Sequence, residues 1–159
     1  MSAATSMRSA RAVADVTTGM LLASIDIKAT PERVFRALAS EDIAKWWGSP
    51  DLYRVTKWTG EVKVGGQWSS VGEDRDGKPF EVSGEFLEID PPKKLVQTWA
   101  PKWVEGPATT VTYLLTAIEG GTRITVRHEG FGNAAAACES HAAGWERVFT
   151  WLGTWLEQT

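Results

Sequence analysis

Hydrophobic and polar positions alternate with a period of two over residues 21–27, the pattern of a strand with one buried face. Thr30 followed by Pro31 then predicts the start of a helix, because threonine caps a first turn and proline is tolerated within it. A second short helix is expected from a cap at Ser40, and the run 48–50, Gly-Ser-Pro, ends it.

Residues 52–129 read as short strand-type runs separated by turn residues, which is the pattern of an antiparallel meander. The turn signals are Gly65-Gly66, Asp76-Gly77, Pro91-Pro92 and Gly120-Gly121. The runs are 53–58, 67–72, 80–89, 95–99, 110–118 and 122–128. Together with the first strand they predict about seven strands.

Apolar residues recur at three- and four-residue spacing from Ala134 almost to the C-terminus and predict the longest helix, with Asn133 as its N-cap. The sheet is the only large apolar surface available to that helix. The fold class expected is therefore α+β, a long C-terminal helix packed across a curved antiparallel sheet. Residues 1–18 are expected to be a flexible N-terminal tail, and residues 19–159 the domain.

Composition excludes several classes of partner. A formal net charge of -3 gives no basic footprint for nucleic acid. No apolar run approaches the ~20 residues of a membrane-spanning helix. The single cysteine, Cys138, cannot form an internal disulfide, which favours a reducing, cytoplasmic location. We expect no nucleic-acid or membrane partner, and either a monomer or a homodimer.

Both histidines of the chain are expected to face the interior. His128 shares its side of a strand with Ile124 and Val126, and His141 lies four residues before Trp145 on the buried stripe of the last helix. An imidazole can transfer protons or bind a ligand near neutral pH. Each histidine could equally satisfy a buried carbonyl or a water, which is the more frequent role.

Cys138 lies one turn before His141, which raises a Cys-His-His metal site completed by His128. The motifs CxxC, HxxxH and HExxH are absent from the sequence. No metal, no cofactor and no catalytic residue is therefore assigned.

Nine tryptophans are the unusual feature of the composition. Each buries on the order of 150–250 Å² when packed, either as core or as the flat wall of a pocket. The sequence does not separate these two roles. The candidate ligand-binding residues are Trp47, Trp68, Phe86, Trp99, Tyr113, His128, His141 and Trp145.

Several stretches carry a family resemblance through their order and spacing. They are Pro31-Glu32-Arg33-Val34-Phe35, Trp46-Trp47-Gly48, Val64-Gly65-Gly66-Gln67-Trp68, Gly84 to Ile89 with Pro91-Pro92, Leu95-Val96 with Thr98-Trp99, Gly120-Gly121-Thr122, His128-Glu129-Gly130-Phe131, and His141 with Gly144-Trp145. The chain resembles the AHSA1-type proteins, which are single-domain relatives of the C-terminal domain of the activator of the 90-kDa heat-shock chaperone ATPase. They belong to the SRPBCC, or START-like helix-grip, superfamily.

The resemblance implies a seven-stranded sheet gripping the C-terminal helix around a hydrophobic cavity. Relatives include lipid binders, hormone binders and polyketide cyclases, and a shared fold does not transfer chemistry. The leading hypothesis is binding of a small apolar or aromatic molecule in that cavity. The second is a cyclase- or hydratase-like enzyme that uses an inward histidine. The third is a co-chaperone-like interaction or stress-response protein with an exposed apolar patch.

Overall fold

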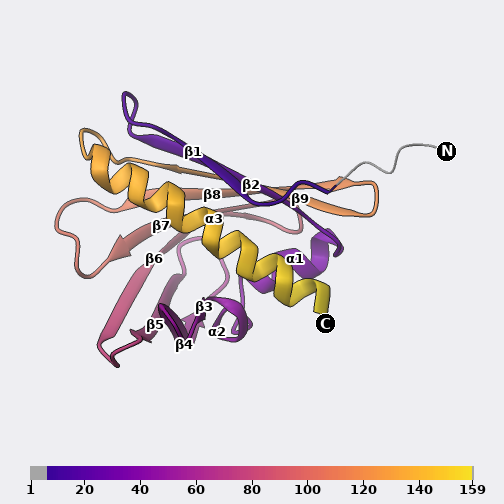
Figure 1. Cartoon of the computed structure of the whole chain (residues 1–159), viewed down its shortest axis with the longest axis horizontal. Helices are drawn as coiled ribbons and strands as arrows, with labels where there is room; N and C mark the ends of the chain where they lie inside the picture. Colours follow the sequence, from indigo (N-terminus) through magenta and orange to yellow (C-terminus); the bar gives the residue numbers. More distant parts are fainter. Residues whose placement is uncertain (1–6, 159) are drawn as a thin grey trace.

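The computed structural model describes residues 7–158, which form one antiparallel sheet, two short helices and one long helix (Figure 1). The strands are β1 Arg11–Asp15, β2 Met20–Ile27, β3 Gly48–Ser49, β4 Tyr53–Gly60, β5 Gln67–Asp74, β6 Pro79–Asp90, β7 Lys94–Pro101, β8 Thr109–Ile118 and β9 Gly121–Glu129. The helices are α1 Pro31–Leu38, α2 Ile43–Trp46 and α3 Ala135–Gln158.

The sheet runs in the order β1-β2-β9-β8-β7-β6-β5-β4-β3. All six strands predicted between residues 52 and 129 are present, and each turn signal falls between two of them. Gly77 and Gly120 have φ angles of 81° and 82°, a backbone region that glycine adopts without steric cost. The predicted α+β helix-grip architecture is confirmed, with nine strands in the described residues where about seven were expected. The additional strands are β1 and β3.

Strand β1 corrects the prediction that residues 1–18 are a flexible tail. It pairs with β2 along its whole length, from Arg11 opposite Ser24 to Asp15 opposite Met20. The backbone N–H of Ala12 also donates to the Glu146 carboxylate on α3. These backbone bonds order the segment although its composition is typical of a tail. The part of the predicted tail formed by residues 1–6 lies outside the described residues.

The short helices connect β2 to β3 and β4 at the opposite edge of the sheet. In α1, Thr30 Oγ1 accepts a hydrogen bond from the backbone N–H of Arg33, as a threonine N-cap does. Ser40 does not cap α2 directly, because α2 begins at Ile43 after Asp42. Its hydroxyl instead donates to the carbonyl of Arg36 and accepts from the N–H of Asp42, which links the end of α1 to the start of α2.

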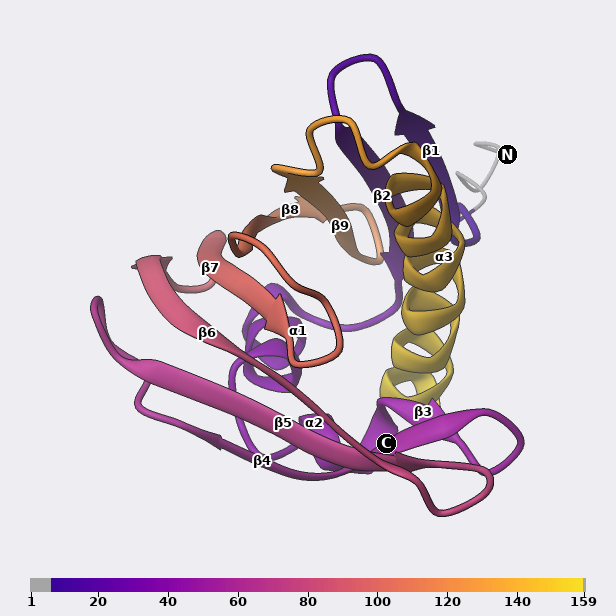
Figure 2. The same cartoon turned by 90° about the vertical axis from the view of Figure 1, so that its left-hand side faces the viewer.

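Helix α3 packs chiefly on β2 and β1, and the sheet curves so that β4, β5 and β6 face it from the opposite side (Figure 2). Its buried side chains include Trp145, Phe149 and Leu152, on the predicted stripe. The helix begins at Ala135, and Asn133 contributes its backbone carbonyl, which accepts from the N–H of Ala135. The curvature leaves the interior between α3 and β4–β8 to be filled by side chains.

Candidate functional site

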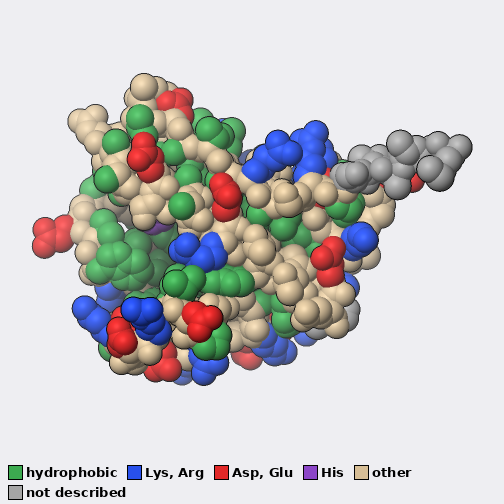
Figure 3. All heavy atoms as spheres, in the orientation of Figure 1, with side chains coloured by type: hydrophobic (Ala, Val, Ile, Leu, Met, Phe, Trp, Pro, Cys, Tyr) green, Lys and Arg blue, Asp and Glu red, His purple; other side chains and the backbone are tan. Residues whose placement is uncertain are grey.

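A cavity of about 380 Å³ lies between α3 and the inner face of the sheet. This volume falls in the range of small-molecule sites. It is lined by Ile43, Trp47, Tyr53, Val55, Trp58, Trp68, Ser70, Phe80, Val82, Gln97, Trp99, Trp103, Tyr113, Ser140, His141, Gly144, Trp145, Arg147 and Val148. The space-filling view shows a hollow of hydrophobic side chains beside a histidine (Figure 3).

Tryptophans from different elements form the inner wall of the cavity. The ring of Trp99 on β7 lies 5.4 Å from Trp68 on β5 and 5.8 Å from Trp145 on α3, between centroids. Trp47, directly after α2, stacks on Trp99 at 5.9 Å. Tyr113 on β8 meets Trp145 edge to face at 5.7 Å, and its burial raises the pKa of the phenol. The wall is therefore flat and apolar, and ring contacts join side chains from β5, β7, β8, α3 and the end of α2.

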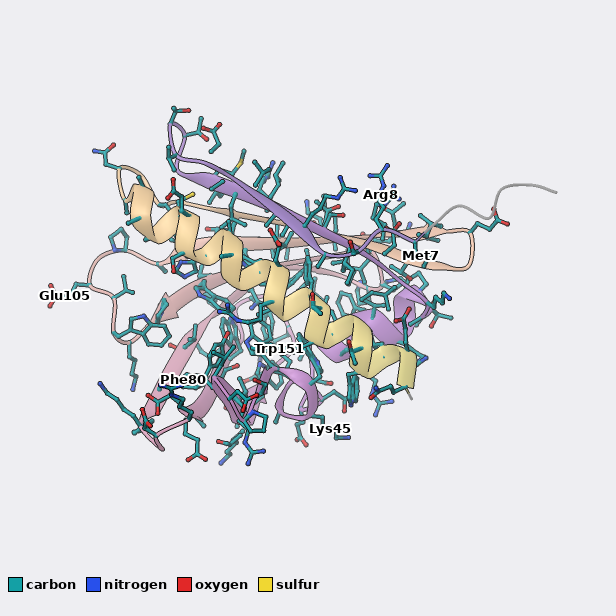
Figure 4. All side chains as sticks on the ribbon, viewed as in Figure 1. Met7, Arg8, Lys45, Phe80, Glu105 and Trp151 are labelled. Carbon is teal, nitrogen blue, oxygen red and sulfur yellow. The ribbon has the colours of Figure 1, made fainter. Side chains whose placement is uncertain are left out.

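A second aromatic group lies where the cavity approaches the surface. Tyr53 on β4 meets Phe80 on β6 at 5.5 Å and Trp151 on α3 at 5.6 Å. Figure 4 labels Phe80 and Trp151, which come from the sheet and from the helix. Trp103, in the loop between β7 and β8, lies 6.3 Å from Phe80 and is 63% exposed. These rings form the mouth of the cavity.

Two polar atoms on the cavity wall have no hydrogen-bond partner within the described residues. They are Nε1 of Trp68 and Oε1 of Gln97, whose residues are 3% and 5% exposed. Trp68 stands opposite Gly84, and a Cβ added at Gly84 would lie 2.7 Å from Trp68 Nε1. The indole N–H therefore lies over β6, against Gly84. The unpaired donor and the unpaired acceptor are enclosed by protein and belong to two residues that line the same cavity.

His128 lies behind this wall and both of its ring nitrogens are hydrogen-bonded. The indole N–H of Trp145 donates to Nδ1 over 3.1 Å, and Nε2 lies 2.6 Å from Thr109 Oγ1. An indole nitrogen is only a donor, so Nδ1 carries no proton and Nε2–H donates to Thr109. The Thr109 hydroxyl in turn donates to the carbonyl of Trp99 over 3.2 Å. One assignment of protons satisfies every hydrogen bond from Trp145 through His128 and Thr109 to the carbonyl of Trp99.

Burial and, as a smaller cause, the neighbouring imidazole of His141 together lower the pKa of His128 to about 3. The side chain is therefore neutral near neutral pH. Because both nitrogens are already paired, His128 has no free position for a ligand or a transferred proton. Its role in the structure is to hold Trp145 and Thr109 in place.

His141 is oriented differently and lines the cavity. Its Nδ1 lies 2.8 Å from the carbonyl of Ala137, one turn earlier in α3, and donates to it because a carbonyl only accepts. No bond to Nε2 is present among residues 7–158. The ring is held at 5.2 Å from His128 and 5.0 Å from Phe131. Nε2 is therefore the ring nitrogen of His141 without a partner in the described residues.

The structure brings six of the eight predicted ligand-binding residues together around the cavity, namely Trp47, Trp68, Trp99, Tyr113, His141 and Trp145. His128 lies off the cavity lining, and Trp145 and Thr109 occupy both of its nitrogens. Phe86 is also fully buried and lies off the cavity lining. Both face inward, His128 as its strand phase predicted, but phase alone does not tell cavity wall from closed core.

Sequence reasoning missed Tyr53, Phe80, Gln97, Trp103 and Arg147. For Gln97 a signal was available, because it shares its strand phase with Leu95 and Trp99, which makes it a glutamine at an inward position. Trp103 lies in a loop and has no periodicity to read. Arg147 falls between two apolar positions of α3, where a long side chain reaches the helix edge.

The Cys-His-His site considered from the sequence has no support in the geometry. The Cys138 thiol donates to the carbonyl of Met20 on β2, over 3.4 Å. Within residues 7–158, no group of three or more His, Cys, Asp or Glu side chains is placed to hold a metal ion. Burial raises the pKa of this thiol, with Asp15 and Glu139 adding to the shift, so the residue is a poor nucleophile.

Comparison with known proteins identifies the family. The model of the family described as Activator of Hsp90 ATPase homolog 1-like protein matches residues 28–157. The chain belongs to this family. The matched AHSA1-type region covers α1 to α3 and includes every residue that lines the cavity.

One curated relative of this AHSA1-type chain is the human Activator of 90 kDa heat shock protein ATPase homolog 1, with 29% identity over 121 residues. The alignment covers 76% of the chain but only 31% of the human protein. A solved structure from Rhodobacter sphaeroides has a TM-score of 0.81 and 22% identity, covering 96% of this chain and all of that one. One from Mycobacterium smegmatis has a TM-score of 0.78 and 19% identity, covering 97% and 99%.

These structural likenesses show the helix-grip fold, which usually forms a ligand cavity between sheet and helix. No described helix has the length and apolar character needed to cross a membrane.

Proposed function

We propose that this protein binds a small, mainly aromatic molecule that carries a hydroxyl or similar polar group in the cavity between α3 and the sheet. The observation that supports this most directly is the pair of unpartnered buried atoms, Trp68 Nε1 and Gln97 Oε1, in two residues that line a mainly aromatic and aliphatic cavity. A buried polar group without a partner costs about 1–3 kcal/mol. A guest that accepts from Trp68 and donates to Gln97 recovers that free energy on binding.

The rings around the cavity determine the rest of the guest's chemistry. Trp47, Trp99 and Trp145 present faces and edges that pack on a planar aromatic guest, which gains about 0.5–1.5 kcal/mol per ring pair beyond area burial. A flexible aliphatic chain of equal area lacks that ring contribution. We therefore propose a flat, ring-containing guest in preference to a lipid chain.

The proposal is tested with 2-naphthol and 2-methylnaphthalene, a pair of similar shape in which only the naphthol has a hydroxyl. Isothermal titration calorimetry of the whole chain should show 2-naphthol binding about thirtyfold more tightly, since its hydroxyl satisfies two buried groups that contribute about 1 kcal/mol each. Replacing Gln97 by Leu should remove most of that preference, and Trp68→Phe should reduce it while retaining the ring. Gln67→Leu, on an exposed neighbouring position, is the matched control.

Equal affinity for the two probes, or a preference that survives in Gln97→Leu, would contradict the assigned polar contacts. Failure of both probes to bind would count against the cavity as a ligand site. Native mass spectrometry of protein purified from its own cells then identifies any small molecule that it retains.

We propose a second function, acid–base catalysis on a bound carbonyl compound, on the strength of one observation. His141 holds its ring with Nδ1 and presents Nε2 without a partner in the described structure, which is the arrangement a general base needs. A cyclase- or hydratase-like reaction would use this nitrogen to remove a proton next to a carbonyl group. His128 does not share this role, because both of its nitrogens are bonded.

This second function is tested by proton exchange of the cyclic ketone 2-tetralone. In deuterated buffer, a base at Nε2 removes a proton next to the carbonyl to form the enolate, and deuterium is returned in its place. Proton NMR should show exchange faster than in buffer alone and a return to the buffer rate for His141→Gln. An unchanged rate with the wild-type protein would exclude general-base action on this probe.

A co-chaperone-like role has weaker support. The exposed large apolar side chains are distributed over the N-terminal hairpin, β6, β8 and three loops, and the largest of them, Trp103, lines the cavity. The human relative carries the name of a chaperone activator, and the chain spans about a third of its length. This distribution favours a small guest over a docked protein.

A further inference from the structure

Arg147 places a positive charge at the mouth of the cavity. It lies on the exposed edge of α3 among the lining residues, and its guanidinium carbon is 5.8 Å from the centroid of the Trp151 ring. The contact with the indole face orients the guanidinium without neutralising its charge. No Asp or Glu of residues 7–158 lies within salt-bridge distance of it.

The cavity lining carries no opposing charge. None of the described lining residues is Asp or Glu, and Arg147 is the arginine or lysine among them. The chain as a whole has the opposite balance, with 20 acidic and 17 basic residues. A cationic rim on an acidic protein is therefore a local property of the site. Such a rim attracts anions and disfavours cations.

From these observations, we infer that the guest is an aromatic anion whose carboxylate, or a group of the same charge and shape, lies against Arg147 at the mouth. This inference rests on the proposed binding function and adds the class of molecule. The rings lie among the tryptophans, and a hydroxyl at the far end meets Trp68 and Gln97. A guanidinium presents paired N–H donors that match a carboxylate. The class is thus the hydroxyaryl carboxylates.

The arrangement separates two recognition tasks along the cavity. The inner atoms, Trp68 Nε1 and Gln97 Oε1, recognise a neutral hydrogen-bonding group. They lie in a dry environment, where an unpaired polar atom costs free energy. The guanidinium of Arg147 recognises the negative charge of the guest at an exposed position. Because water still reaches this position, the ionised group of the guest is never fully desolvated. An anion with its charge at one end and its hydroxyl at the other satisfies both positions in one orientation.

The test compares 6-hydroxy-2-naphthoate with 6-hydroxy-2-naphthamide, which differ in charge but hardly in shape. Titration calorimetry near pH 7 and low salt should give about fivefold tighter binding of the naphthoate, the upper range for a partly exposed ion pair. The preference should shrink as salt is added. Arg147→Gln should abolish it, and Arg147→Lys should retain part of it. Arg75→Gln, at an exposed position of the β5–β6 turn outside the cavity lining, should leave it unchanged as a control of equal charge loss.

Different results would contradict the anion inference and the proposal that the cavity binds a ligand. If both naphthalene compounds bind equally to the wild-type protein, or if Arg147→Gln keeps the preference, the anion inference is overturned while ligand binding stands. If neither compound binds, the cavity proposal fails first. The circular dichroism spectrum and thermal unfolding of Arg147→Gln should match those of the wild-type protein, which shows that the variant is folded.

Discussion

The indole N–H of Trp145 donates to Nδ1 of His128 across 3.1 Å and joins the middle of α3 to β9. The same imidazole donates from Nε2 to Thr109 on β8. One side chain thus connects the helix to two central strands directly behind the cavity wall. Replacing His128 should therefore lower the free energy of unfolding of the whole domain.

Replacing His128 by Phe keeps the ring volume but removes one acceptor and one donor. The buried N–H of Trp145 and the hydroxyl of Thr109 then lose their partner, so we expect a loss of about 2–4 kcal/mol in the free energy of unfolding. Urea denaturation followed by tryptophan fluorescence measures it. His141→Phe loses only a local bond to Ala137 and should cost less. Equal losses in the two variants would contradict the bridging role.

The depressed pKa of His128 makes stability depend on pH. In the folded protein it is about 3 and in the unfolded chain about 6.5, so below pH 6.5 the unfolded state binds a proton that the native state excludes. The stability that the protein gains by burying His128 in its neutral form is complete above pH 6.5. Below that pH the free energy of unfolding falls by about 1.4 kcal/mol per pH unit, down to about pH 3. His128→Phe should have a shallower slope between pH 4 and 6. If the free energy of unfolding falls with the same slope in the wild-type protein and in His128→Phe, His128 does not dominate the pH dependence of stability.

Asp26 on β2 forms the most buried ion pair described, with both of its oxygens accepting from Arg123 on β9, at 2.8 and 3.0 Å. The hydrogen bonds from Arg123 hold the pKa of Asp26 below its usual value, against the effect of burial. The resulting stability is present above pH 3.8 and is lost as the pH falls through the lower native pKa.

Asp26→Asn should therefore cost about 1–3 kcal/mol at neutral pH and progressively less in acid. Thermal unfolding at several pH values tests this. The exposed pair Arg127–Glu129 provides the control, because Glu129→Gln should change stability by less than about 0.5 kcal/mol. A pH-independent effect of Asp26→Asn would exclude the charge as its cause.

Two glycines of α3 should respond oppositely to alanine. A Cβ at Gly144 meets only Arg147, at 3.9 Å, so Gly144→Ala should stabilise by about 0.5–1 kcal/mol through helix propensity. A Cβ at Gly153 would lie 3.1 Å from Ile25 on β2, and the tight fit should cancel or reverse that gain. Urea denaturation of both variants compares them directly. A gain at Gly153 as large as at Gly144 would show that β2 and α3 are less closely packed than described.

Trp103 should affect binding more than stability. Its side chain is 63% exposed, so Trp103→Ala should change the free energy of unfolding by less than about 0.5 kcal/mol. Because it lines the mouth, the same variant should weaken 2-naphthol binding several-fold, mainly through faster release. Stopped-flow fluorescence measures the release rate. Val64→Ala, another exposed apolar position away from the lining, should leave the rate unchanged.

Local patterning was sufficient for most elements. Period-two alternation located β2 and the meander, and the helix-period stripe located α3, because burial of one face imposes that spacing on any sequence. The same phase correctly placed His128 on the inner side of β9. It did not find β1, because Arg11–Asp15 are ordered by pairing with β2 and by α3, which are long-range contacts.

The sequence by itself determined the architecture, the family and the inward side of β2, β9 and α3, since these follow from periodicity and the order of motifs. Only the tertiary structure decided which inward residues bound an open space. His128 and His141 look alike in the sequence, yet Trp145 and Thr109 enclose one while the other faces the cavity. Likewise Gln97 gained significance only when neighbouring strands left its oxygen unpaired. Such differences arise because a cavity is defined by side chains distant in sequence, whose packing no local pattern records.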